Sequence, residues 1–264
     1  MNNFLSLPSF SWRAIAVWRR NFLVWRKLAI PSVLGNLADP MIYLFGLGYG
    51  LGSLLPPNLT TLGGVSYIVF LASGTVCAST MNAASFEALY SGFSRMHVQK
   101  TWEAILNAPV ALDDVLAGEW LWAASKATLS GLAIMVVITA LGFISSPLAL
   151  WAIPVVFLTG LAFAALGLIV TALAPSYDFF MYYFTLFLTP MVLLCGVFFP
   201  VEQLPSLLQS VAGQLPLAHA VRLVRPLLLG EWPADAGNHL AALLITSLAA
   251  YWLALVLTRR RLLK

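Results

Sequence analysis

The chain has 264 residues, of which 61% are hydrophobic and only 9% are charged, and its mean hydropathy is +0.90. Soluble domains carry roughly 25% charged residues, so this composition excludes a soluble enzyme or carrier and predicts one integral membrane domain over residues 1–264. The net charge of +4 comes from cations near the two ends of the chain, which favours anionic membrane lipids over nucleic acid as partners.

The first predicted element is a basic amphipathic helix over residues 10–29. On a helical wheel, one face carries Ile15, Trp18, Phe22, Trp25 and Ala29, and a different arc carries Arg13, Arg19, Arg20, Arg26 and Lys27. A helix rich in tryptophan and cations is typical of a segment that lies in the membrane interface; packing against a soluble partner is the alternative. Pro31 ends this helix before the first span.

Six later stretches are apolar and long enough to cross a bilayer, which takes about 20 residues. They are Val33–Leu54, Tyr67–Tyr90, Glu119–Phe143, Leu148–Leu173, Phe179–Phe199 and His239–Leu257. Both terminal segments and the loop 91–118 carry cations, whereas the loop 56–64 and the turn 145–147 carry none. Because cations concentrate in cytoplasmic loops, we expect an all-α, polytopic membrane protein with six transmembrane helices and both termini in the cytoplasm.

Glycines alternate with other residues inside the first span, at Gly46, Gly48, Gly50 and Gly52. They contain two interleaved Gly-x-x-x-Gly spacings, which allow two helices to approach closely. This pattern fits either a dimer interface or pore lining, or packing within one chain.

A short polar segment, residues 95–109, lies between the second and third spans. Read as a helix, it places Val98, Trp102, Ile105 and Leu106 on one side and Gln99, Lys100, Glu103 and Asn107 on the other. A polar element with two distinct faces is unusual in so apolar a chain. We interpret it as a docking element for a cytoplasmic motor that this chain lacks.

Beyond the first residue of each predicted span, three charged side chains lie inside the spans, where a charge must be paired or hydrated. Asp39 lies in the first span, Glu87 near the cytoplasmic end of the second, and Lys126 in the cytoplasmic part of the third. Their depths permit ion pairs among them. Such a polar network would either gate a cytoplasmic opening or hold the bundle together.

Aromatic residues open the fifth predicted span and recur just after it. Tyr182, Tyr183, Phe187, Phe198 and Phe199 are the candidates for a path along which a sugar or a lipid chain slides. Aromatic side chains at a membrane interface are the simpler explanation.

The segment 200–237 is long, moderately apolar and divided by four prolines. By the alternation of the spans it faces the exterior, and we expect short helices that re-enter the outer leaflet where protein covers their backbone. Two further complete spans are the alternative, but Arg222 and Arg225 make a full crossing expensive.

The sequence contains no Walker-type Gly-x-x-x-x-Gly-Lys-Ser/Thr motif, no His-Glu-x-x-His and no Gly-x-Ser-x-Gly. Asp113 and Asp114 are adjacent, so on a helix they point about 100° apart and do not form a catalytic pair; we expect them to begin the third long helix near its positive end. We therefore expect no catalytic residue, no metal ligand and no cofactor on this chain.

Four motifs together resemble the ABC-2 type transporter permeases, and most closely their NodJ-like branch, the membrane subunits of lipo-oligosaccharide exporters. The motifs are Gly35–Pro40 (GNLADP), Gln99–Ala104 (QKTWEA), Thr171–Asp178 (TALAPSYD) and Phe199–Pro205 (FPVEQLP). The likeness covers nearly the whole chain; the Phe-Pro-x-x-x-Leu-Pro pattern marks the broad family, and the second and third motifs mark the branch.

This resemblance implies a six-span half-transporter in the bacterial inner membrane that forms a homodimer. Two copies of a separate ATP-binding-cassette ATPase, which carries the ATP and Mg, would dock on its cytoplasmic side. The coupling helix of such permeases maps onto Arg95–Asn107, so the resemblance assigns contact with the ATPase to Arg95, Gln99, Lys100, Thr101, Trp102 and Glu103.

The leading prediction is therefore a permease that exports a lipo-oligosaccharide or related amphipathic glycolipid. An ion-coupled secondary transporter is the main alternative and would require an inverted repeat, which the sequence does not clearly show. An intramembrane transferase would need a cluster of carboxylates or histidines at one depth of the membrane.

Overall fold

The computed structural model describes residues 5–9, 11–54, 61–62, 65–144 and 146–263 and folds them almost entirely into helices. The helices are α1 (Arg13–Arg26), α2 (Ala29–Phe45), α3 (Gly52–Leu54), α4 (Tyr67–Phe86), α5 (Thr101–Leu106), α6 (Leu112–Ala140), α7 (Ala152–Leu173), α8 (Phe179–Tyr183), α9 (Thr189–Leu194), α10 (Ser206–Ala212), α11 (Pro216–Leu229) and α12 (Ala236–Leu262). Two short strands, β1 (Thr61–Leu62) and β2 (Val65–Ser66), precede α4 in the sequence. They pair antiparallel, with Thr61 opposite Ser66.

Several helices run on through turns of π-helix or 3-10 helix. The π-helical segments are Gly46–Leu51, Glu87–Ser91, Ser94–Val98 and Phe184–Leu188, and the 3-10 segments are Pro147–Trp151 and Val201–Gln203. Among the described residues, five continuous helical stretches are consequently long and apolar enough to cross a membrane. They are Ala29–Leu54, Tyr67–Val98, Leu112–Ala140, Pro147–Leu173 and Ala236–Leu262. The chain is a multi-pass membrane protein, and these stretches agree with five of the six predicted spans.

The predicted span Phe179–Phe199 is shorter in the structure. Its helix ends at Leu194, and the continuous stretch Phe179–Leu194 falls in the class of shorter apolar helices. The chain turns at Gly196, whose φ of +77° favours glycine over other residues. The prediction was wrong about where this helix ends because it followed hydropathy, which continues through Phe198 and Phe199, and ignored the turn.

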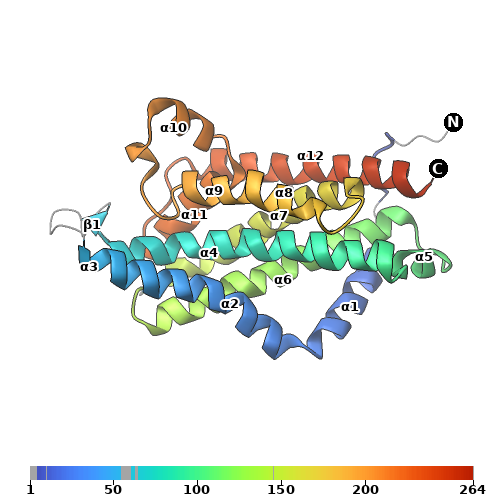
Figure 1. Ribbon diagram of the computed structural model, residues 1–264, viewed down its shortest axis with the longest axis horizontal. Coiled ribbons are helices and arrows are strands. Elements are labelled where there is room, and N and C mark those ends of the chain that lie inside the picture. Colours follow the sequence, from blue (N-terminus) through green and yellow to red (C-terminus); the bar gives the residue numbers. More distant parts are fainter. Residues whose placement is uncertain (1–4, 10, 55–60, 63–64, 145, 264) are drawn as a thin grey trace.

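The bundle is built around α4. Of the most apolar 18-residue window in Tyr67–Val98, 83% is buried inside the protein, against 12% for Ala29–Leu54. α4 packs against α6, α7, α11 and α2, and α12 packs along α7. The N-terminal and C-terminal ends lie with α5 at one end of the bundle, whereas β1, α3 and α10 lie at the opposite end (Figure 1).

The helix α1 packs across α6 and meets α2 at a sharp angle (Figure 1). The close approach depends on Gly118, where an added Cβ would lie 2.5 Å from Cβ of Val17. Trp18 Nε1 donates a hydrogen bond to Ser125 Oγ at 3.0 Å. The predicted apolar face of this helix is thus turned mainly toward α6, although Ile15, which was placed on it, is exposed.

The segment 200–237 forms short helices, as expected from its prolines: a 3-10 turn, α10 and α11. α11 is held by Arg225, whose guanidinium donates to Ser73 Oγ at 2.9 Å and to the carbonyl of Gly196 at 2.6 Å and stacks on the ring of Phe70. Burial lowers the pKa of Arg225 to about 10. Arg222, by contrast, is exposed.

Candidate functional site

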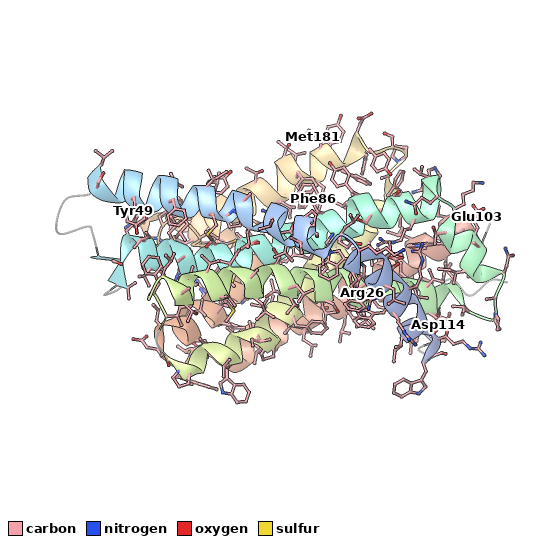
Figure 2. The ribbon with its side chains drawn as sticks, turned by 90° about the horizontal axis from the view of Figure 1, so that it is seen from below. Arg26, Tyr49, Phe86, Glu103, Asp114 and Met181 are labelled. Atoms are coloured by element: carbon pink, nitrogen blue, oxygen red, sulfur yellow. The ribbon has the colours of Figure 1, made fainter. Side chains whose placement is uncertain are left out.

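The short helix α5 presents one buried and one exposed side. Trp102 is 1% exposed, and Ile105 and Leu106 pack against the same core. On the outer side, Lys100 and Glu103 are 68% and 59% exposed and lie 3.7 Å apart. Figure 2 shows Glu103 near the end of the bundle opposite Tyr49. α5 therefore offers a charged surface while its indole fixes it to the membrane helices.

The polar segment 95–109 is not one helix, which corrects the sequence prediction. Residues Ser94–Val98 continue the long helix of α4, and α5 starts only at Thr101. Lys100 between them adopts the left-handed conformation, with a φ of 53°, which breaks the helix and resets its direction. The predicted apolar face was consequently wrong at Val98, which is 61% exposed.

Beneath α5 lies a buried charge cluster of Glu87, Arg95, Glu119 and Lys126. Arg95 Nη2 lies 2.9 Å from Glu87 Oε1 and 2.5 Å from Glu119 Oε2, and Lys126 Nζ lies 2.7 Å from Glu87 Oε2. Both carboxylates are about as buried as the apolar core, at 3% and 2% exposure. Because a buried charge is tolerated only with partners, these contacts tie α6 to the helix that begins as α4.

The cluster also holds two indoles. Trp102 Nε1 of α5 donates to Glu119 Oε1 at 3.1 Å, and Trp122 Nε1 donates to Glu87 Oε1 at 2.8 Å. Arg95 Nε donates to the same oxygen of Glu119 at 2.9 Å. Glu119 thus joins α5, α6 and the extension of α4 at one point.

A second set of buried contacts joins the ends of the chain. Arg259 Nη2 donates to Asp113 Oδ2 at 2.5 Å, and the backbone N–H and Oγ of Ser9 donate to the same oxygen at 2.9 and 2.8 Å. Arg261 Nη1 donates to the carbonyls of residues 171, 172 and 174 at the end of α7. The sequence predicts that the cations near the two ends of the chain meet anionic lipids. The structure corrects this for Arg259 and Arg261, which bind protein groups.

The structure describes two of the three side chains of the predicted polar network. Glu87 and Lys126 form the expected ion pair. Asp39 lies in α2, and its side chain falls outside the described residues. Arg95 and Glu119 belong to the same cluster, although the sequence assigned Arg95 to docking and Glu119 only to the start of a helix.

The predicted aromatic path is also divided. Phe198 and Phe86 line a groove of about 350 Å³ between α2, α4, the π-helical segment Phe184–Leu188 and α9. Tyr182 and Phe187 face outward at 64% and 58% exposure, whereas Tyr183 is buried. Phe199 is half-buried.

The glycine-rich stretch of the first span has two environments. An added Cβ at Gly48 would lie 2.9 Å from Ile68 Cγ1, so this glycine serves packing within the chain. Gly46 and Gly50 have open space around them, and their face is free for another partner.

Sequence reasoning missed Glu119, Trp122 and Asp113 as structural centres. One signal was available: an acidic residue in an apolar helix needs a cation at the same depth, and Arg95 and Arg259 were assigned elsewhere. In the part of the chain that the structure describes, no group of three or more His, Cys, Asp or Glu side chains lies close enough to hold a metal ion.

Comparison with known proteins gives a consistent result. The sequence model described as "ABC-2 type transporter" matches residues 13–229. A "Nodulation protein J" of Rhizobium meliloti (strain 1021) is 51% identical over 97% of this chain and 97% of its own length. The namesake from Rhizobium leguminosarum bv. trifolii is also 51% identical, over 98% and 97%. The "Inner membrane transport permease YadH" of Escherichia coli (strain K12) is 24% identical over 80% of each chain.

Proposed function

The chain belongs to the ABC-2 type transporter family, and on that premise we propose that it is the permease subunit of an exporter for a lipo-oligosaccharide or a related amphipathic glycolipid. Relatives named "Nodulation protein J" share about half of its residues over nearly the full length, which supports a shared substrate class. Membership in this family favours a permease driven by a separate ATPase over an ion-coupled secondary transporter.

We propose that α5 is the coupling element that meets a separate ATP-binding-cassette ATPase. The observation that carries this proposal is the contrast on α5 between the exposed pair Lys100–Glu103 and the buried Trp102. Gln99 is exposed beside this pair and Thr101 is half-buried, so both can add contacts. Arg95 and Trp102 would act from beneath, by holding α5 on the charge cluster.

The proposed orientation puts α5 and both termini in the cytoplasm of a bacterium, with the helix over Phe179–Leu194 as a short sixth crossing of the inner membrane. The common position of α5 and the two ends supports this orientation (Figure 1). Exposed cations of the two terminal helices, Arg19 and Arg26 in α1 and Arg260 in α12, agree with the rule for cytoplasmic segments. α10 and α11 would then form the external re-entrant segment.

We further propose a homodimer served by two copies of the ATPase, which would bind the ATP and Mg. The π-helical segment that follows α2 is suited to contact with the second copy, because Gly46 and Gly50 have open space around them. The groove lined by Phe86 and Phe198 would form part of the path of the glycolipid, and the exposed Tyr182 and Phe187 would add to it.

The test is reconstitution of the chain in nanodiscs with the ATP-binding-cassette subunit encoded beside it. Exchanging the two charges, Lys100→Glu with Glu103→Lys, should remove glycolipid-stimulated ATP hydrolysis while membrane insertion stays normal. Glu231→Lys is the matched control, since Glu231 is exposed and follows α11 far from α5. If the double variant hydrolyses ATP as the control does, α5 is not the coupling element. If no lipo-oligosaccharide stimulates the unaltered complex, the proposed substrate class is wrong.

A further inference from the structure

A pocket of about 500 Å³ opens between α1, α6 and the extension of α4, next to the buried charge cluster. α1 contributes Arg20, Asn21 and Trp25 to its lining, and the membrane helices contribute Arg95 and Lys126. No residue of α5 itself lines this space, although Gln99 just before α5 does. Its walls combine cationic, amide and aromatic groups, the chemistry that binds an anion with an apolar part.

The charges around the pocket do not balance. Three cations, Arg20, Arg95 and Lys126, stand against two carboxylates, Glu87 and Glu119. The carboxylates are occupied by Arg95 and Lys126. Arg20 lies within ion-pair distance of no carboxylate among the residues that the structure describes, and its Nη1 donates to Asn21 Oδ1 at 2.9 Å.

The lowered pKa of Arg20 agrees with an excess of positive charge around the pocket. Its pKa lies below the ordinary value because it is partly buried and because Arg95 is nearby, and Glu119 offsets this only in part. An anion in the pocket would relieve the repulsion between the two guanidinium groups.

A donor in the pocket also lacks an acceptor. Asn21 is 3% exposed, and its Nδ2 has no hydrogen-bond partner among the described residues. Lys126 Nζ has three protons, of which one is directed at Glu87. A buried donor without an acceptor costs free energy, so the pocket is built to receive oxygen atoms of a ligand.

We propose that this pocket binds the phosphodiester headgroup of an anionic membrane lipid. Arg20 and Lys126 Nζ would donate to its non-bridging oxygens, and the acyl chains would extend along the side of α1. That side is apolar and open, since Leu23 and Val24 are 40% and 55% exposed. Basic pockets between membrane helices on the cytoplasmic side suit such headgroups. The bound lipid would fix α1 against α6 whichever substrate the permease exports.

The test compares lipids bound to the purified full chain by native mass spectrometry. The protein is offered phosphatidylglycerol and phosphatidylcholine in equal amounts, and separately inorganic phosphate as a competitor. We expect one retained phosphatidylglycerol and a preference over phosphatidylcholine of about tenfold, the equivalent of one charge-assisted hydrogen bond.

Arg20→Gln should weaken retention of phosphatidylglycerol about tenfold, and Arg20→Lys should restore part of it. The matched control is Arg19→Gln, which removes the same charge from an exposed position one residue away and should leave retention unchanged. Normal assembly with the ATPase shows that each variant is folded. The proposed site is wrong if Arg20→Gln and Arg19→Gln lose the same amount of bound phosphatidylglycerol. It is also wrong if the unaltered protein retains both lipids equally. If inorganic phosphate displaces the lipid at equal concentration, the proposal that the ligand is a lipid is wrong, and the pocket binds a soluble anion.

Discussion

Trp102 gives the sharpest test of how α5 is held. Trp102→Phe keeps most of the buried apolar surface but removes the N–H that donates to Glu119 Oε1. Glu119 keeps its bonds to Arg95, so the carboxylate is not left unpaired and the cost should be about 1–2 kcal/mol. That free energy corresponds to a factor of roughly 5–30 in the ratio of docked to undocked α5.

Trp102→Ala is the stronger perturbation. Truncating a buried tryptophan costs about 3–5 kcal/mol, and α5 has only six residues, too few to be a stable helix without its packing. We therefore expect α5 to detach in this variant and coupled ATP hydrolysis to be lost.

Two measurements follow the effect. Hydrogen exchange over residues 99–107 reports the docking of α5, and stimulated ATP hydrolysis by the complex reports coupling. Trp12→Ala is the control, because Trp12 is 87% exposed. The reasoning is refuted if Trp102→Ala exchanges no faster than the control, or if Phe and Ala at this position have the same effect.

Two further predictions concern other buried groups. Arg259→Gln leaves the carboxylate of Asp113 without its cation and should cost about 3–5 kcal/mol, seen as a lower Tm in detergent; Arg260→Gln, at an exposed position, should change the Tm little. His219 Nδ1 and His239 Nδ1 lie 2.8 Å apart, and the pKa of His219 is lowered by burial and then by its neighbours. The unfolded chain therefore binds more protons, so stability should fall as the pH drops below about 6.5; His219→Gln should flatten this dependence, and an unchanged slope would contradict it.

Hydropathy predicted most of the fold because a bilayer leaves few choices for the backbone. The span predicted to end at Leu173 ends there in the structure as well. The third apolar span was predicted to start only at Glu119, since Asp113 and Asp114 lower the local hydropathy. The expectation that these two aspartates begin the helix is confirmed, because α6 starts at Leu112. They are tolerated there because Arg259 and residues of the N-terminal segment bind them.

The site was predictable only in its residue types. Periodicity identified Trp102 as apolar and Lys100 and Glu103 as exposed, which the structure reproduces. It did not reveal the break at Lys100, because a positive φ at a lysine follows from the surrounding packing and not from local propensity. Nor could it pair Arg95 with Glu119, 24 residues away, since that contact depends on how α4 and α6 align along their lengths.

The shared carboxylate of Glu119 has a mechanical consequence. Since Trp102 of α5 and Arg95 of the α4 extension both bond to it, α5 cannot shift without straining two long helices. A displacement of α5 is therefore transmitted to the ends of α4 and α6. It is not taken up by a flexible loop. The stiffness of this joint, more than the strength of any surface contact, sets how far a displacement at α5 travels along the bundle.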